Sequence, residues 1–271
     1  MPAFDPNETF QSVGDTICAM GWRQKQVTQP LLYGDLVPWY RLIDPVDDHA
    51  DEAAAIQVAI ERAVESRPET LLELGAGAGH NAFHLKRRFR CTLNDLSEAM
   101  LGLSRDLNPD CEHVLGDMRT LRLGRQFDAV LIHDAIMYLT NEGDVRAAAE
   151  TAFAHTRPGG AAVFAPDAVR ETFQEGSETF SAQDGVRSMR GLDWSMDPDP
   201  TDDTFVTEYV FLLREGDVVS LVHDRHIEGL FSIETWRRIL MGVGFDVATF
   251  KRPVDDHGET DEIFICRRPE R

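Results

Sequence analysis

Three glycines at alternate positions, Gly75, Gly77 and Gly79, follow the short apolar run of residues 71–74 and precede the helically spaced stretch His80–Phe89. The apolar run is long enough for a buried strand, so the segment predicts a strand that turns sharply through glycines into a helix. Glycine permits a positive φ and lets a ligand approach the backbone closely. The first N–H groups of the new helix point into such a turn. The segment therefore predicts an α/β fold with a ligand-binding turn after its first strand.

The glycine spacing and the acid before it indicate the kind of ligand. Dinucleotide-binding turns prefer G-x-G-x-x-G, with a pyrophosphate at the helix N-terminus, whereas the spacing here is G-x-G-x-G. Glu73 lies two residues before Gly75, where a carboxylate would be poorly placed beside a pyrophosphate. It would suit a ligand that carries an ammonium group and no phosphate. An NAD-dependent oxidoreductase is thus the disfavoured alternative, and a Gly-rich turn without a ligand is a second one.

Acidic residues follow the next two predicted strands. Asp95 ends the strand predicted over residues 91–94, where an acid can accept hydrogen bonds from ribose hydroxyls. The third predicted strand, Glu112–Leu115, is followed by Asp117 and Met118. Taken alone, Asp117 could equally be a turn residue that caps its own backbone. Its position after Asp95 favours a place in the same ligand site.

The fourth predicted strand, Phe127–Ile132, is almost continuously apolar and ends at His133 and Asp134. Such strands are typical of parallel sheets. Ligands of open α/β sheets bind outside the carboxyl ends of the strands. The segment HDAIMYL, which includes Tyr138, is therefore expected where a substrate and a cofactor would meet.

These motifs, in the order ELGAGAG, LNDLSEAML, GDM and RPGG, resemble the class I S-adenosylmethionine-dependent methyltransferases over roughly residues 31–266. Within that superfamily the chain looks most like bacterial amino-sugar N-methyltransferases, on the basis of residues 108–130 and of a hairpin followed by LFSIETW. The resemblance implies an α/β, Rossmann-like class I methyltransferase fold. That fold has a mostly parallel seven-stranded sheet with helices on both faces, here with an antiparallel hairpin insert after strand five.

The resemblance also implies S-adenosylmethionine as the cofactor and S-adenosylhomocysteine as its product. The acceptor would be a small molecule, methylated on N or O by in-line displacement, and a non-catalytic S-adenosylmethionine-binding protein is an alternative. Aromatic residues near the start of the core could close over the ligand or simply pack on the sheet. The residues expected to bind the cofactor are Tyr33, Tyr40, Glu73, Gly75, Ala76, Gly77, Gly79, Asp95, Leu96, Asp117, Met118 and His133.

The catalytic candidates are His133, Asp134 and Tyr138, with His223 and His226 on the hairpin as further candidates for a base. An amine nucleophile must only be neutral, whereas a hydroxyl nucleophile needs a stronger base within hydrogen-bond reach. His133 is the best placed, although each of these residues could instead orient the substrate. Tyr138 stands where some sugar enzymes carry a catalytic-looking histidine.

Charge and composition narrow the partners. The net charge of −20 argues against nucleic acid, and no apolar run approaches the roughly 20 residues that span a bilayer. Four scattered cysteines, without a C-x-x-C, and an N-terminus without signal-peptide character predict a cytoplasmic location. The acidic run of residues 47–52 suits a helix N-terminus, so no metal site is expected. A homodimer is a further possibility.

Local patterns predict the remaining organisation. Residues 1–50 form an N-terminal arm or lid and residues 51–271 the methyltransferase core, with an insert at 166–230 that covers the substrate or forms a dimer interface. Residues 166–203 are expected to be loop-like, followed by the hairpin. The other predicted elements are helices over 47–64, 97–107, 142–156 and 232–243, strands over 161–165, 245–250 and 262–266, and hairpin strands over 204–213 and 218–227.

Overall fold

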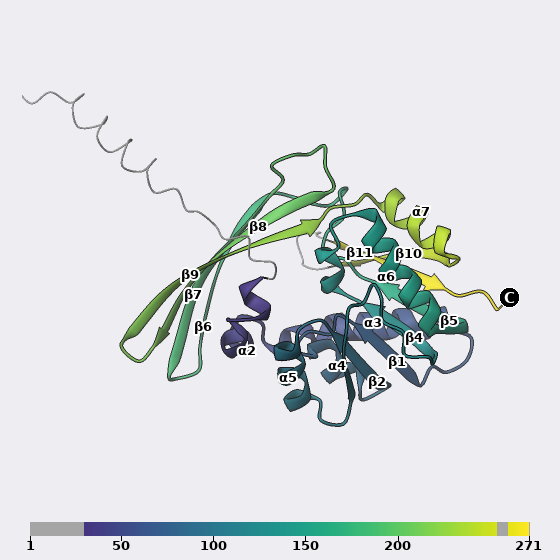
Figure 1. The fold of residues 1–271 in the computed structure, drawn as a ribbon, viewed down its shortest axis with the longest axis horizontal. Helices are drawn as coiled ribbons and strands as arrows, with labels where there is room; N and C mark the ends of the chain where they lie inside the picture. Colours follow the sequence, from purple (N-terminus) through teal and green to yellow (C-terminus); the bar gives the residue numbers. More distant parts are fainter. Residues whose placement is uncertain (1–29, 254–259, 271) are drawn as a thin grey trace, which may run out of the picture.

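The computed structural model describes residues 30–253 and 260–270 of the chain. Its core is a seven-stranded sheet in the order β10-β11-β5-β4-β1-β2-β3, in which β11 runs antiparallel to β5 and β10 antiparallel to β11 (Figure 1). The mostly parallel sheet confirms the predicted fold. The strands are β1 (Thr70–Leu74), β2 (Arg90–Asp95), β3 (Glu112–Leu115), β4 (Phe127–Ile132), β5 (Thr156–Phe164), β10 (Asp246–Pro253) and β11 (Thr260–Arg267).

Helices cover both faces of this sheet because side chains alternate between the faces along each strand. Leu71 and Leu93 are buried with Ile56 on one face, whereas Leu72 is buried with Trp236 on the other. The strands therefore need apolar residues at successive positions, as the sequence has. The helices are α3 (Ala50–Ala63), α4 (His80–Leu85), α5 (Glu98–Leu107), α6 (Glu142–His155) and α7 (Ile233–Val243).

Helix ends follow the capping residues of the sequence. Ser97 and Ser232 accept hydrogen bonds from the backbone N–H groups of Met100 and Thr235, as N-caps do. Several element boundaries differ from the prediction by a few residues, most clearly the starts of two elements. The helix expected from residue 47 begins as a 3-10 turn, η3 (Val46–His49), and the expected turn over 157–160 is the irregular start of β5.

A second, antiparallel sheet in the order β6-β7-β8-β9 extends away from the core (Figure 1). The predicted hairpin is present as its two longest strands, β8 (Thr204–Glu215) and β9 (Val218–Gly229). The loop expected over residues 166–203 is wrong, because β6 (Gly176–Gln183) and β7 (Arg187–Met196) lie there. β6 is a mostly exposed, polar edge strand, so it lacks the apolar alternation that would reveal a strand.

The inner face of the second sheet packs on the segment before α3. Met189, Phe211 and Leu213 are buried there against Leu32 and Leu36. That segment consists of η1 (Leu31–Tyr33), η2 (Val37–Trp39), α2 (Tyr40–Ile43) and η3. Its aromatic residues are thereby held beside the carboxyl ends of the core strands. Most of the predicted arm or lid, residues 1–29, lies outside the described residues, so the predicted domain division stays a prediction.

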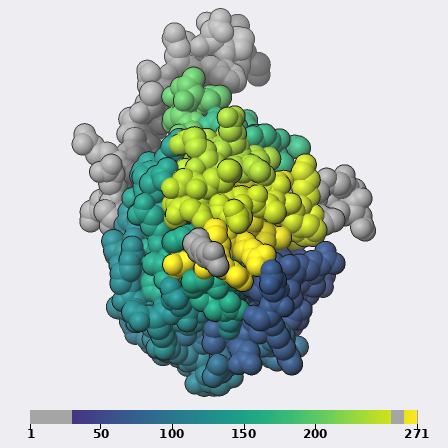
Figure 2. All heavy atoms as spheres, turned by 90° about the vertical axis from the view of Figure 1, so that its right-hand side faces the viewer, coloured from purple at the N-terminus to yellow at the C-terminus, as the bar shows by residue number. Residues whose placement is uncertain are grey.

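The opposite side of the core is formed by α7 and the C-terminal strands, which lie together on the surface in Figure 2. Trp236 of α7 stacks on Phe264 of β11, with ring centroids 5.5 Å apart. In the part of the chain that the structure describes, no helix is both long and apolar enough to cross a membrane.

Candidate active site

A cavity of about 580 Å³ lies at the carboxyl ends of β1, β2 and β4. This is the position at which open α/β sheets bind their ligands. Of the residues predicted from the sequence, Gly79, His223 and His226 do not line it. Those that do are Tyr33, Tyr40, Glu73, Gly75, Ala76, Gly77, Asp95, Leu96, Asp117, Met118, His133, Asp134 and Tyr138.

The glycine turn is fixed by both backbone conformation and hydrogen bonds. Gly75 has a φ of 75°, and a Cβ built on it would lie 2.3 Å from the Cβ of Ala135. Asp95 holds the turn from the neighbouring strand, because its carboxylate accepts hydrogen bonds from the N–H of Gly77 at 2.8 Å and of Ser97 at 2.7 Å. Asp95 thus shapes the turn and still lines the cavity. Its predicted bond to a ribose stays a prediction.

Gly79 allows close packing against neighbouring residues and does not line the cavity. It precedes α4 with a φ of 75°, and a Cβ there would lie 2.4 Å from Ser104 Oγ and 2.5 Å from Asn108 Nδ2. Both neighbours belong to α5 and its C-terminus. The glycine therefore allows the turn to pass directly under α5. Its predicted role as a cofactor contact stays a prediction.

Glu73 ends in the cavity as a buried carboxylate that lacks a partner. Glu73 is only 3% exposed, and its Oε2 has no hydrogen bond within the described residues. Burial raises the pKa of Glu73 to about 8. A ligand ammonium group placed here would supply the missing partner. The site therefore fits the α-ammonium group of a methionine moiety.

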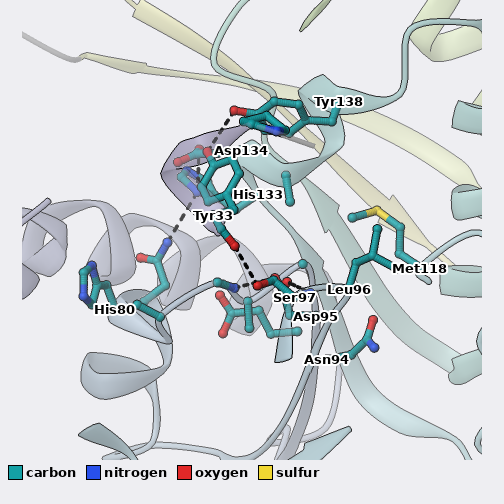
Figure 3. Close-up of a pocket in the computed structure, with 18 of the residues that line it drawn as sticks. Tyr33, His80, Asn94, Asp95, Leu96, Ser97, Met118, His133, Asp134 and Tyr138 are labelled. Carbon is teal, nitrogen blue, oxygen red and sulfur yellow. Dashed lines mark hydrogen bonds and ion pairs between the residues drawn. The ribbon is translucent and has the colours of Figure 1, made fainter. Parts of the chain in front are cut away.

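The other end of the cavity is apolar. Leu96 is 66% exposed there, and Figure 3 shows it beside Met118 on the same side of the cavity. An exposed leucine facing a partly buried methionine suits the face of a flat ring.

Asp117, predicted to bond an adenine amino group, is instead held by Arg119, whose Nη2 lies 2.6 Å from its Oδ2. An adenine amino group would have to share this carboxylate with the guanidinium.

His133 lies between two carboxylates. Its Nδ1 is 2.5 Å from Asp134 Oδ1 and its Nε2 is 2.8 Å from Glu52 Oε1, while Arg252 also pairs with Glu52. Burial alone would lower the pKa of His133, but the two carboxylates outweigh burial and hold it well above its usual value. A cationic imidazole has no lone pair with which to accept a proton. The geometry therefore argues against the predicted role of His133 as a base.

A second histidine–carboxylate group lies near the glycine turn. Asp44 pairs with His49 Nε2 at 2.7 Å and His80 Nδ1 at 3.1 Å, and it accepts a hydrogen bond from Tyr40 at 2.9 Å. Burial would lower the pKa of His49, but Asp44 and Glu52 raise it to about 10. The predicted cofactor residue Tyr40 is thus fixed in place by a charged network.

Tyr33 and Tyr138 meet above the glycine turn. Their hydroxyl groups are 2.8 Å apart, and Tyr138 is also 2.8 Å from His226 Nδ1. The backbone carbonyl of Tyr33 accepts a hydrogen bond from Ser97, so Tyr33 lies between the Asp95 side of the cavity and Tyr138 (Figure 3). By contrast, His223 faces away from this group and pairs with Glu208 at 2.7 Å.

Several cavity residues were not found from the sequence. Ser97 could have been, because it directly follows the Asp95 position and was already identified as a helix cap. Asp44 and His49 carried no signal, because only packing of the second sheet brings their segment to the cavity. The other cavity residues that were missed include His80, Asn81, Asn94, Arg119, Arg225 and Ile227.

Among the residues that the structure describes, two groups of side chains have ligand atoms close enough for a metal ion. They are Asp44 with His49 and His80, and His133 with Asp134 and Asp167. Asp44 pairs with His49 and His80, and His133 pairs with Asp134, which is also hydrogen-bonded to Asp167. These charges neutralise each other without an ion, so we propose no metal at either position.

Comparison with known proteins finds that part of this chain is similar to methyltransferases. Residues 71–160 match the model of a family described as a methyltransferase domain. A dTDP-3-amino-3,4,6-trideoxy-alpha-D-glucopyranose N,N-dimethyltransferase of Streptomyces venezuelae is 35% identical over 131 residues, which cover 48% of this chain and 55% of that protein. A dTDP-3-amino-3,6-dideoxy-alpha-D-glucopyranose N,N-dimethyltransferase of Streptomyces fradiae is 34% identical, over 48% of this chain and 51% of that protein. The chain thus spans about half the length of the curated relatives it matches.

Solved structures extend the similarity to most of the chain. DesVI of Streptomyces venezuelae superposes with a TM-score of 0.75 at 25% identity, covering 88% of this chain and 98% of its own. An S-adenosylmethionine-bound amino pentose methyltransferase from Micromonospora echinaspora gives a TM-score of 0.71 at 26% identity, covering 81% and 91%. The match therefore includes elements well outside residues 71–160.

Proposed function

We propose that the chain is a class I S-adenosylmethionine-dependent methyltransferase and that it methylates an amino group of a small, sugar-like molecule. Transfer to a hydroxyl group is the alternative. The proposal rests on the cavity at the strand ends and on the amino-sugar methyltransferases that the chain resembles.

The observation that carries the cofactor assignment is the buried, unpartnered carboxylate of Glu73. A buried carboxylate without a partner is unfavourable by several kcal/mol in general, so it indicates a cationic ligand group. Leu96 and Met118 at the other end suit an adenine ring, and Asp95 between them suits a ribose. A dinucleotide would place a phosphate near Glu73, and a phosphate offers no cationic group to pair with the buried carboxyl group. These features support S-adenosylmethionine and disfavour NAD.

The chemistry needs little covalent help from the protein. The sulfonium of S-adenosylmethionine supplies a methyl group that is already activated. The side chains of this protein must then align the acceptor and keep its amine neutral. Tyr33 and Tyr138 lie in the cavity wall next to the half-exposed Asp134, where they can bind and orient an acceptor amine.

The acceptor side of the cavity is acidic and rich in hydroxyl groups. Asp134 at the end of β4 and Asp167 after β5 have carboxylate oxygens within 4.8 Å of each other and of a His133 nitrogen. The Asp134 carboxylate lines the cavity and can accept a hydrogen bond from an acceptor amine, and the two tyrosines can bind sugar hydroxyls. We therefore assign Asp134 and Tyr138 to acceptor binding and leave His133 to hold the charge network. A free thiol state of Cys91, Cys111 and Cys266 supports the proposed cytoplasmic location.

The test has two parts. Calorimetric titration with S-adenosylhomocysteine and, separately, with NAD identifies the cofactor; binding of NAD alone would overturn the proposal. Methyl transfer from labelled S-adenosylmethionine is then measured with a dTDP-linked 3-amino sugar, the same sugar without the nucleotide, and the 3-hydroxy analogue. We expect transfer to the amines and none to the hydroxy sugar. Transfer to the hydroxy sugar alone would favour O-methylation, and binding without transfer to any of the three a non-catalytic protein.

A further inference from the structure

A buried chain of hydrogen bonds leads away from the acceptor side of the cavity. The Tyr33 hydroxyl is 2.8 Å from the Tyr138 hydroxyl, which is 2.8 Å from His226 Nδ1. His226 Nε2 is in turn 3.0 Å from Asp224 Oδ2, and both of these residues are less than 5% exposed. The chain joins η1, η4 (Asp134–Tyr138) and β9, three elements that are far apart in the sequence.

The direction of these hydrogen bonds follows from the last group. Asp224 is buried, which would raise its pKa, but hydrogen bonds from His226 and from the Leu32 N–H outweigh burial and lower it. An ionised carboxylate can only accept, so His226 Nε2 must carry the hydrogen. In neutral His226 the Nδ1 lone pair then faces Tyr138, which must donate to it. Tyr33 must therefore donate to Tyr138.

The hydroxyl oxygen of Tyr33 is consequently left with free lone pairs. Burial holds the pKa values of both Tyr33 and Tyr138 well above the usual value, so both are neutral phenols. The free lone pairs of Tyr33 need a donor, and Tyr33 lines the cavity. An ammonium group of the acceptor is such a donor.

We propose that Tyr33, Tyr138 and His226 form a proton relay that deprotonates the acceptor ammonium before methyl transfer, with Asp224 as a positioning residue. This inference rests on the proposed function, because it assumes an amine acceptor. The ammonium N–H bond breaks as its proton passes to Tyr33, the Tyr33 proton passes to Tyr138, and the Tyr138 proton passes to His226 Nδ1. The products are a neutral amine, two neutral phenols and an imidazolium paired with Asp224.

The surroundings of His226 suit this role. The titratable groups that face it are Asp224 and Glu228 from its own strand, Tyr209 from β8, and the two tyrosines of the relay. Asp224 stays hydrogen-bonded to Nε2 when Nδ1 takes up the proton, and the phenols are neutral. His133, which is already cationic, cannot take the proton. The relay thus supplies the proton acceptor that the strand-four loop lacks.

The first test compares His226→Gln and Tyr138→Phe with the wild-type protein, using the dTDP-linked 3-amino sugar as acceptor. The matched control is His223→Gln, because His223 lies on the same strand but faces the other side and is paired with Glu208. The relay predicts that kcat of both relay variants falls about 10–100-fold near pH 7 and recovers near pH 9, where the amine loses its proton unaided. The His223→Gln profile should coincide with that of the wild type.

A structural role would give a different result. If the substitutions only distorted the site, kcat would fall by the same factor at every pH, and this outcome would overturn the relay. Titration with S-adenosylhomocysteine, expected to give an unchanged Kd in all three variants, shows that the cofactor site is intact. If the wild type binds S-adenosylhomocysteine but methylates no amine, the proposed acceptor class is wrong, and the relay, which assumes an amine, falls with it.

A second measurement does not need the acceptor. Nitrogen-15 NMR of histidine-labelled protein, with His226→Gln to assign the signal, reports which ring nitrogen carries the hydrogen. The relay requires the Nε2–H tautomer of neutral His226, with a hydrogen-bonded lone pair on Nδ1 that is altered by Tyr138→Phe. A hydrogen on Nδ1 of the neutral ring would reverse the chain and overturn the proposal.

Discussion

Among the cavity residues, Glu73 shows most clearly that the site without a ligand is unfavourable. It is buried, its Oε2 lacks a partner, and burial raises its pKa to about 8. Near pH 7 it therefore holds a proton in the free protein. A bound ammonium group would lower this pKa, because an opposite charge favours the ionised form. Cofactor binding should thus release up to about one proton from Glu73.

The corresponding prediction is that Glu73→Gln folds normally but loses affinity for S-adenosylhomocysteine by about 30–1000-fold, as expected when one partner of a buried charge pair is removed. For the wild type, affinity should rise with pH up to about pH 8, since the proton no longer competes with the ligand. Calorimetry in buffers of different ionisation enthalpy measures the proton release.

Glu69→Gln is the matched control, because the Glu69 side chain is 70% exposed at the start of the same region. It should leave both the affinity and the proton release unchanged. If wild type and Glu73→Gln bound S-adenosylhomocysteine with equal affinity, Glu73 would not belong to the cofactor site.

At the scale of elements, the contact between the glycine turn and α5 decides how α4 is placed. Asn108 donates a hydrogen bond to the Gly79 carbonyl at 2.9 Å, and Ser104 lies against the same glycine. The turn and the end of α5 therefore fit together only if position 79 has no side chain. The cofactor turn is thus supported by a helix that does not itself contact the predicted ligand.

We predict that Gly79→Ala destabilises the protein by about 2–4 kcal/mol, since it combines an unfavourable φ with overpacking. Gly102→Ala is the control within α5 itself, where a Cβ would meet nothing within 4 Å. It should be neutral or stabilise by up to about 1 kcal/mol, because alanine is the better helix former. Urea unfolding measures both values. Equal stability of the two variants would show that the α5 contact is not tight.

At the scale of the whole molecule, charged pairs tie the segment before α3 to the core. His49 pairs with Asp44 and lies 3.6 Å from Glu52. Glu52 also pairs with His133, which follows β4, and with Arg252 of β10. The network thus spans the molecule from the segment that carries Tyr33 to the edge of the seven-stranded sheet. Its charges are a source of pH-dependent stability.

His49 makes this dependence testable. Its folded-state pKa is raised from 6.5 to about 10, so its contribution is fully present below about pH 6.5 and is lost as pH rises through about 10. The unfolding free energy of the wild type should therefore fall between about pH 6.5 and about pH 9.5 by about 1–3 kcal/mol more than that of His49→Gln. Parallel pH profiles for the two proteins would show that the pair contributes nothing.

The outer face of the four-stranded sheet is the natural surface for the predicted homodimer. The strand register places Leu192, Trp194, Leu212 and Leu221 on one face, and they are 37–62% exposed. Contiguous exposed apolar residues mark interaction surfaces. Light scattering should find a dimer for the wild type and monomers for the double variant that combines Leu212→Glu with Leu221→Glu. The control Val186→Glu, at a hairpin turn, should remain a dimer. A monomeric wild type would contradict the prediction.

The sequence by itself determined the core of this protein. The run of residues 71–74, the glycine turn and the strands over 112–115 and 127–132 could be predicted because each depends on local pattern: apolar continuity, glycine conformation and capping. The cavity residues at the strand ends could be predicted as well, since the carboxyl ends of parallel strands meet at one edge. For the same reason, the sequence predicts that Glu73 and Asp95 lie beside one cavity.

Only the tertiary structure decided the charge states and the partners. The sequence made His133 the favoured base, but Glu52, 81 positions away, and Asp134 make it a cation, and no local pattern reveals such a contact. The chain from Tyr33 through Tyr138 to His226 likewise joins three distant segments. Pairing of β8 with β9 and packing of that sheet on residues 31–43 bring them together. A proton acceptor is defined by its surroundings, and those surroundings are set by packing between elements.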